Sequence, residues 1–144
     1  MKSRAMLLMA GLVMVACSGL QPVQIAAGDV CFNCRKMINE PRVAAEVIDK
    51  DGRAYKFRTA GCMAKWLKKN PTEKPAEMFA TDYATGRLVK VTAVKFVPTM
   101  MGEGRDRALD YVAFYGDEGA VEAAQREKTQ PVDWNGVLAA VNPD

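Results

Sequence analysis

The pattern of apolar and polar positions beyond residue 42 begins with two short apolar runs on either side of a polar turn. The first run is Val43 to Ile48, the second is Ala54 to Phe57, and the letters DKDG stand between them. Two such runs around a turn of this composition predict a β-hairpin. Apolar and charged residues alternate through the second run, which predicts that this strand has one solvent-exposed face.

A helical pattern follows the hairpin. Thr59 is a good N-cap residue, and the apolar residues after it have the spacing i, i+3, i+4. These apolar residues are Met63, Trp66 and Leu67. The helix should end near Asn70, since Pro71 follows. Residues 77 to 83 then form another extended segment before a turn at 85–86. The first half therefore predicts the order strand, strand, helix, strand.

The second half has a similar pattern. Leu88 to Val97 and Tyr111 to Tyr115 predict two strands, and Asp117 can cap a helix after them. The expected inward-facing residues of this helix are Ala120, Val121 and Ala124. Residues 130–134 predict a short returning strand, and residues 137–141 a further turn. We therefore expect an α+β fold with two small ββαβ units in tandem, at residues 29–86 and 87–144.

Between the two predicted strands of the second unit lies the sequence PTMMGEGRDRALD, which predicts an exposed loop. Met100 and Met101 stand at its start. Methionine usually fills cores, so two methionines at the start of a glycine-containing, charged loop are unusual.

The N-terminus has the features of a bacterial lipoprotein leader. Lys2 and Arg4 precede an apolar run, Ala5 to Ala16, which is too short for a comfortable membrane span. A small residue before Cys17 resembles a lipobox, in which the cysteine is acylated after cleavage. Residues 1–16 are thus predicted to be a signal peptide, and residues 17–28 a lipidated tether. A plain secretory signal cut elsewhere is the alternative.

Charge and composition narrow the class of function. The chain has 144 residues with a formal net charge of +3, and Lys2 and Arg4 of the leader account for most of this excess. No basic stripe with interleaved aromatic residues occurs, so we expect no nucleic-acid partner. The chain contains no histidine, which excludes serine–histidine and cysteine–histidine catalysis and histidine-ligated zinc. We do not expect an enzyme.

The sequence CFNCRKM gathers Cys31, Cys34 and Met37 within residues 31–37, and Cys62 is a further cysteine of the mature chain. Structural zinc normally requires four cysteine or histidine ligands, so this set is one short. A thioredoxin-like redox pair and a plain disulfide are two other interpretations. Cu(I) is the fourth, because it accepts a small number of thiolate and thioether ligands. Composition favours copper, and the other interpretations stay open.

Residues 29 to 67, DVCFNCRKMINEPRVAAEVIDKDGRAYKFRTAGCMAKWL, resemble the NosL family of copper-chaperone lipoproteins, which serve nitrous oxide reductase. The sequence TMMGEG and the later YVAF resemble that family's second half. This resemblance implies a fold of two ββαβ units, related to that of an organomercurial lyase. It also implies periplasmic Cu(I) binding and transfer to a copper-centre assembly machinery that includes an ABC-type complex of the inner membrane.

By resemblance, the principal metal ligands are Cys31, Cys34 and Met101. The secondary candidates are Met37, Met100 and Cys62. The chain departs from the family pattern at Lys36, where the family has its methionine, and it lacks the histidine that many members have.

The sequence thus predicts a Cu(I) metallochaperone on a lipid anchor at Cys17, facing the periplasm from the outer membrane, as Ser18 favours by analogy with enterobacterial sorting. A periplasmic thiol–disulfide protein using Cys31 and Cys34 is the main alternative. A structural lipoprotein with a vestigial site is a weaker one.

Overall fold

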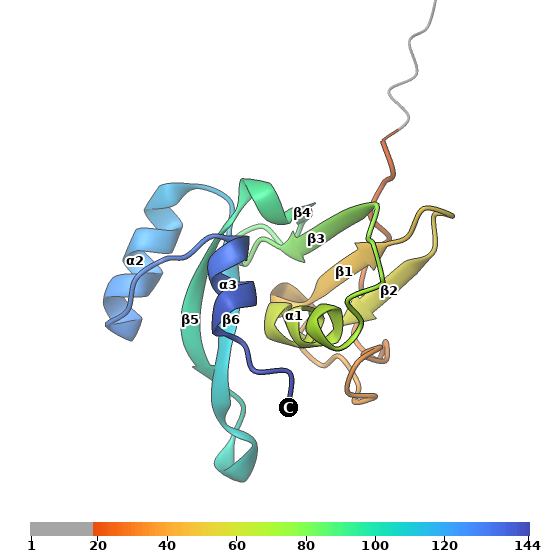
Figure 1. The fold of residues 1–144 in the computed structure, drawn as a ribbon. Helices are drawn as coiled ribbons and strands as arrows, with labels where there is room; N and C mark the ends of the chain where they lie inside the picture. Colours follow the sequence, from red (N-terminus) through yellow and green to blue (C-terminus); the bar gives the residue numbers. More distant parts are fainter. Residues whose placement is uncertain (1–18) are drawn as a thin grey trace, which may run out of the picture.

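The computed structural model describes residues 19–144, so the predicted signal peptide and the lipidation site Cys17 lie outside the described residues. Two antiparallel sheets form the framework (Figure 1). The first has the strand order β2-β1-β3-β4, and the second is the hairpin of β5 and β6. Among the described residues, no helix has the length and apolar character needed to cross a membrane.

The bounds of the strands and helices are β1 Ala45–Ile48, β2 Ala54–Phe57, α1 Ala60–Lys69, β3 Glu77–Thr81, β4 Leu88–Lys90, β5 Lys95–Met101, β6 Ala108–Phe114, α2 Asp117–Glu127 and α3 Trp134–Ala140. There are also three short 3-10 helices: Pro41–Val43 before β1, Val91–Ala93 between β4 and β5, and Gly104–Asp106 between β5 and β6. The α+β class predicted from the sequence is confirmed.

The first half follows the predicted order. In the turn between β1 and β2, the Asp49 carboxylate accepts hydrogen bonds from the N–H groups of Asp51 and Arg53, and Gly52 has a φ of 80°. This left-handed conformation suits glycine. Helix α1 begins after Thr59, whose Oγ1 accepts a hydrogen bond of 3.1 Å from the N–H of Cys62. The predicted cap of this helix is therefore confirmed.

The single strand predicted over residues 88–97 is wrong, because the chain forms β4, a 3-10 turn and then β5. Val91 and Val94 are both buried, at 2% and 4% exposure. Their spacing of three residues fits a helical turn, whereas a strand would place them on opposite faces. Strand β4 pairs with β3, so the four-stranded sheet extends past residue 86, where we expected the first unit to end.

The exposed loop predicted around Met100 is mostly strand. Strands β5 and β6 pair from Lys95↔Phe114 to Met101↔Ala108. Only residues 102–107 remain as the hairpin tip, where Gly102 has a φ of 86°. Figure 1 shows this hairpin projecting beyond the rest of the molecule.

The end of the chain also differs from the prediction. The strand expected over residues 130–134 is reduced to one bridge between Val132 and Phe96. Pro131 has no N–H group to donate to a longer ladder, and Asp133 caps α3 by accepting a hydrogen bond of 2.8 Å from the N–H of Gly136. In α2, Val121 is 47% exposed and Ala123 is buried in its place. The small side chains of Ala120, Ala123 and Ala124 pack against the β5–β6 hairpin.

Two apolar cores result. The larger core lies between the four-stranded sheet, α1, α3 and one face of the hairpin, and the smaller core lies between the hairpin and α2 (Figure 1). Residues 23–28, which the sequence assigned to the tether, pack on the larger unit. Ile25 is buried, and the N–H of Val23 donates a hydrogen bond of 2.8 Å to the buried carboxylate of Glu46.

The carboxylate of Asp82 connects the two halves. It is buried, and it accepts hydrogen bonds from the N–H of Tyr115 at 2.9 Å, the Thr85 hydroxyl at 2.6 Å and the N–H of Thr85 at 3.1 Å. Burial by itself would raise the pKa of Asp82, but these hydrogen bonds from Thr85 and Tyr115 hold it below its usual value.

Asp82→Asn should therefore lower the free energy of unfolding at pH 7 by about 1–3 kcal/mol, because an amide cannot accept all of these hydrogen bonds. A depressed carboxyl pKa contributes stability above the unfolded-state pKa near 3.8, and this contribution is lost as the pH falls below it. Urea unfolding at pH 7 and pH 3 should show the difference between wild type and variant shrinking at the lower pH. A constant difference would contradict this assignment.

Candidate metal centre

The CxxC sequence lies on a small closed loop. Val30 and Met37 form an isolated antiparallel bridge at its base, and the N–H of Cys31 donates to the carbonyl of Lys36 at 2.9 Å. Arg35 has a φ of 61°, uncommon for a residue with a side chain. Its N–H donates to the carbonyl of Cys31 at 2.9 Å, and its guanidinium lies 5.0 Å from the centre of the Phe32 ring. No α-helix extends from Cys34, since the first α-helix of the described residues begins at Ala60.

The third cysteine comes from α1. The N–H of Phe32 donates to the carbonyl of Lys56 at 2.8 Å, so the loop is fixed beside β2. The chain passes directly from β2 into α1, and Cys62 lies in the first turn of that helix. The Sγ atoms of Cys31, Cys34 and Cys62 lie within 4.8 Å of one another. Cys62, a secondary candidate from the sequence, is therefore part of the thiol cluster.

The three thiols differ in exposure. Cys31 is fully buried, whereas Cys34 and Cys62 are half-buried, and all three are free of disulfides. One side of the cluster is therefore closed by the protein, and the other side is open to an incoming group.

Hydrogen bonding separates the protonation states of two cysteines. The Cys62 thiol donates a hydrogen bond to Cys31, and this hydrogen bond is the main cause that lowers the pKa of Cys31 to about 4. The N–H groups of Cys34 and Arg58 lower the pKa further, whereas burial opposes the shift. The same hydrogen bond, together with burial, raises the pKa of Cys62 above its usual value. The arrangement therefore favours the thiolate form of Cys31 and the protonated form of Cys62.

The donor set fits a soft metal ion. Thiolate–metal bonds are about 2.3 Å long, so two sulfurs on one ion are at most about 4.6 Å apart. The observed limit of 4.8 Å needs only a small adjustment to meet this condition. Thiolates favour Cu(I), which does not need the fourth ligand that structural zinc requires. Deprotonation of the remaining thiols would accompany binding of the ion.

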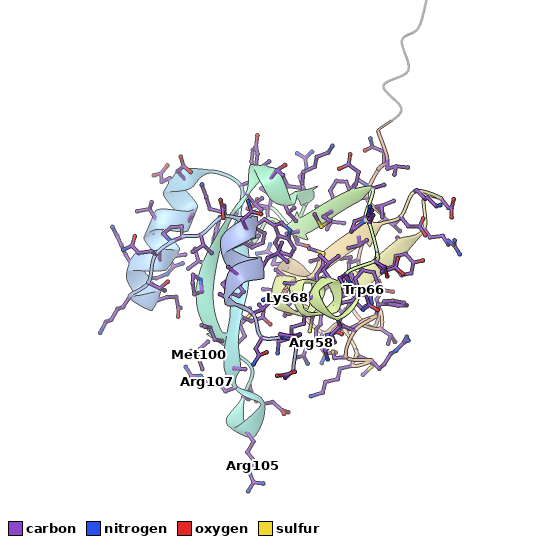
Figure 2. All side chains as sticks on the ribbon, in the orientation of Figure 1. Arg58, Trp66, Lys68, Met100, Arg105 and Arg107 are labelled. Atoms are coloured by element: carbon purple, nitrogen blue, oxygen red, sulfur yellow. The ribbon has the colours of Figure 1, made fainter. Side chains whose placement is uncertain are left out.

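The three candidate methionines occupy different environments. Met37 is 60% exposed at the base of the cysteine loop, and Met100 is 46% exposed on the outer face of the hairpin (Figure 2). Met101 is half-buried and packs against the smaller core. The hairpin tip does approach the cysteine loop, since Lys36 Nζ lies 3.9 Å from Asp106 Oδ1.

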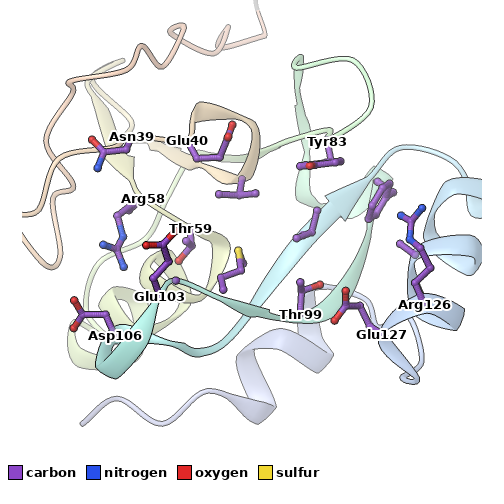
Figure 3. A pocket seen from close by; sticks show the side chains of 16 residues that line it. Asn39, Glu40, Arg58, Thr59, Tyr83, Thr99, Glu103, Asp106, Arg126 and Glu127 are labelled. Atoms are coloured by element: carbon purple, nitrogen blue, oxygen red, sulfur yellow. The ribbon is translucent and has the colours of Figure 1, made fainter.

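Met101 lines an open cavity of about 590 Å³ together with Arg58 and Thr59. Figure 3 shows Arg58 and Thr59 at the end of this cavity that also holds Glu103 and Asp106. Arg58 donates its N–H to Cys31, and Thr59 accepts from the N–H of Cys62. The same two residues thus contact the thiol cluster and the cavity that contains Met101.

An aromatic cluster adjoins the cysteine loop, and sequence analysis missed it. The Phe32 ring lies 4.8 Å from the Tyr55 ring, 5.7 Å from the Trp66 ring and 6.4 Å from the Phe57 ring, measured between centroids. The signal was available, because Phe32 stands inside the CxxC motif and Trp66 lies one helical turn after Cys62. This apolar cover protects the loop from water on one side.

Comparison with known proteins gives a match of fold. No family model matches the chain, and no curated protein sequence matches it. Among solved structures, the crystal structure of the copper chaperone NosL from Shewanella denitrificans superimposes with a TM-score of 0.68. The sequences are 15% identical, and the match covers 81% of this chain and 95% of that one. The resemblance to NosL proposed from the sequence is therefore supported by a shared fold.

Proposed function

We propose that the protein is a lipid-anchored metallochaperone that binds Cu(I) through Cys31, Cys34 and Cys62. The observation that carries this proposal is the approach of the three Sγ atoms to within 4.8 Å in a chain without histidine. The fold, shared with a NosL copper chaperone, supports it. The recipient would be the ABC-type machinery that assembles the copper centres of nitrous oxide reductase, as the sequence resemblance suggests.

The exposure of the thiols suits transfer by ligand exchange. A sulfur or imidazole of the recipient can approach the ion on the side of the half-buried Cys34 and Cys62. Cys31, fully buried, would release the ion last. Met101 lines the cavity that shares Arg58 and Thr59 with the cluster, and we propose it as an intermediate thioether ligand during transfer.

Location in the cell follows from the leader alone. The leader ending at Cys17 and the following Ser18 support acylation of Cys17 and an envelope lipoprotein that faces the periplasm from the outer membrane. An anchored chaperone of this kind needs no catalytic machinery, and we propose no enzymatic activity.

The low pKa of Cys31 also fits the second candidate, a thiol–disulfide protein. However, an attacking thiolate must be accessible, and Cys31 is fully buried. Metal transfer is therefore the better-supported function. A reduction potential in the oxidoreductase range, about −270 to −120 mV, together with disulfide exchange on a reduced protein substrate, would reverse this preference.

The proposal is tested by anaerobic titration of the reduced mature chain with Cu(I) in competition with a chromogenic chelator. We expect one tightly held Cu(I) ion per chain and a thiolate-to-Cu(I) charge-transfer band. In the same experiment with a zinc chelator, the protein should not withdraw Zn(II) comparably. Failure to withdraw Cu(I) from the chelator would contradict the proposal.

For the client, a strain lacking the protein should make nitrous oxide reductase deficient in copper, and a fully loaded reductase would rule out this delivery role.

A further inference from the structure

A second cavity, distinct from the metal centre, lies where the N-terminal segment crosses the four-stranded sheet. It has a volume of about 810 Å³ and lies between residues 21–27 and the strands β3 and β4. Its floor contains Phe79, Thr81 and Leu88. Figure 1 shows the N-terminal segment, in red and orange, leaving the molecule at this side of the sheet.

The charged residues that line this cavity all have one sign. They are Arg42, Arg87 and Lys90, and the lining contains no aspartate or glutamate. Lys90 forms an exposed ion pair of 2.8 Å with Glu77. Neither arginine forms an ion pair with any residue between 19 and 144. Both arginine side chains are exposed, and the guanidinium of Arg42 lies 5.9 Å from the centre of the Tyr83 ring. A wall that contains two arginines and no acidic residue is suited to bind a phosphate group.

The position of the cavity relative to the chain indicates the source of that phosphate. Gln21 and Pro22 are themselves part of the lining. Only Ser18, Gly19 and Leu20 separate Gln21 from Cys17. An extended chain covers at most about 3.5 Å per residue, so the Cα atoms of Cys17 and Gln21 are at most roughly 14 Å apart. An acylated Cys17 would thus keep the cavity close to the lipid headgroups.

The N-terminal segment is also fixed in a manner that keeps this geometry. Lys56 Nζ donates to the carbonyl of Gln24 at 2.9 Å, and the N–H of Val23 donates to the Glu46 carboxylate at 2.8 Å. Ile25 is buried in the larger core. The segment that lines the cavity together with Arg42 and Arg87 is therefore fixed to the four-stranded sheet, only a few residues after Cys17 in the sequence.

We propose that this cavity docks on the membrane surface by binding the phosphodiester of an anionic phospholipid, with Arg42, Arg87 and Lys90 as the contacting residues. The inference rests on the lipid anchor included in the proposed function. Docking would orient the molecule on the membrane, which a single lipid anchor does not do by itself. Each basic residue near an anionic bilayer strengthens binding by about fivefold, so three residues together give on the order of 100-fold.

The test uses the mature chain with Cys17→Ser, which removes the acyl chains and leaves only surface docking. Its binding to vesicles of phosphatidylcholine with 30% phosphatidylglycerol is compared with its binding to pure phosphatidylcholine, in low and physiological salt. We expect a clear preference for the anionic vesicles. The combined variant Arg42→Gln, Arg87→Gln, Lys90→Gln should lose most of this preference, by 30-fold or more.

A matched control removes the same charge elsewhere. Figure 2 places Arg105 and Arg107 at the hairpin tip, at the end of the molecule away from the emerging N-terminal segment. The variant Lys69→Gln, Arg105→Gln, Arg107→Gln should bind the anionic vesicles within about threefold of wild type. Equal losses in both variants would mean that net charge alone drives binding and would overturn the inference.

Two further measurements separate the remaining outcomes. Saturable binding of inorganic phosphate to the free chain, undiminished by anionic vesicles, would assign the cavity to a soluble anion and overturn membrane docking. Cu(I) affinity is measured on the same variants and should not change, so a failure of docking is distinguishable from a failure of the chaperone function. Absence of acylation at Cys17 in the native protein, shown by mass spectrometry, would remove the premise and count against the inference.

Discussion

Replacement of Cys31 by serine is expected to lower the Cu(I) affinity of the mature chain by at least about 100-fold. Loss of residues that only support metal ligands typically costs 10- to 100-fold in affinity, and Cys31 is itself the buried thiolate of the cluster. Serine has nearly the same size but offers a hard oxygen that Cu(I) binds poorly. The measurement is anaerobic competition with a Cu(I) chelator at fixed pH.

The companion variants rank the other sulfurs. Cys34→Ser and Cys62→Ser should each weaken binding by about 10-fold or more, because each leaves two sulfurs on the ion. Met37→Leu is the matched control, since Met37 is 60% exposed and leucine has a similar volume. It should leave affinity unchanged. Met101→Leu separates a thioether ligand from a packing residue, because leucine preserves the contact with the smaller core and removes only the sulfur.

One result would assign the metal to a different site. If Cys31→Ser binds Cu(I) as tightly as wild type while Met101→Leu does not, the ion is held in the cavity near Arg58 and Thr59 rather than at the three thiols. Thermal unfolding of each variant is the necessary control, because Cys31 belongs to the larger core. A variant with an unchanged melting temperature and a reduced affinity identifies a ligand.

Local signals in the sequence predicted the elements that local interactions determine. The hairpin of β1 and β2 has a polar turn between alternating strands, and α1 has Thr59 as its cap. The CxxC spacing alone brought Cys31 and Cys34 together. In each case the residues that form the element are close in sequence, so turn composition and the spacing of the apolar residues or cysteines were sufficient to predict it.

Predictions failed where contacts between distant residues decided the outcome. Nothing near Cys62 in the sequence shows that the N–H of Phe32 donates to the carbonyl of Lys56, yet this contact fixes the cysteine loop beside α1. The break between β4 and β5 depends on burial of Val91 and Val94 in a core formed by other elements. Met100 and Met101 were expected in a loop because their pairing with Leu109 and Ala108 is not visible in the sequence.

The half-buried carboxylate of Asp110 on β6 connects the hairpin to the first turn of α1, and its removal should have the largest effect on stability. Its Oδ2 accepts from the Thr59 hydroxyl at 2.6 Å, and its Oδ1 accepts from the N–H groups of Gly61 at 2.9 Å and Tyr111 at 2.8 Å. Asp110→Ala leaves these donors without an acceptor. Each costs about 1–3 kcal/mol when buried, so we expect a loss of at least about 3 kcal/mol in urea unfolding.

Because Thr59 also caps the turn that carries Cys62, Asp110→Ala should weaken Cu(I) binding as well, although Asp110 belongs to a different element.

Gly61→Ala tests the contact between Gly61 and Asp110 from the other side. A Cβ atom at Gly61 would lie 2.5 Å from Asp110 Oδ1, so the alanine must displace the carboxylate. In the double variant this clash is absent, and the two losses of stability should be clearly less than additive. Additive losses would contradict the contact.

Asp110→Asn isolates the charge from the hydrogen bonds. Burial raises the pKa of Asp110 above its usual value, although the hydrogen bonds from Thr59, Tyr111 and Gly61 oppose this effect. The folded state therefore binds the carboxyl proton more tightly than the unfolded state does, and ionisation costs stability above the folded-state pKa. As the pH falls from 7 towards 4, wild type should gain stability relative to Asp110→Asn, and the gain should end near the ordinary aspartate pKa of 3.8. A difference between the two proteins that stays constant, or changes in favour of the variant, over this range would show that the carboxylate is stabilised where it lies.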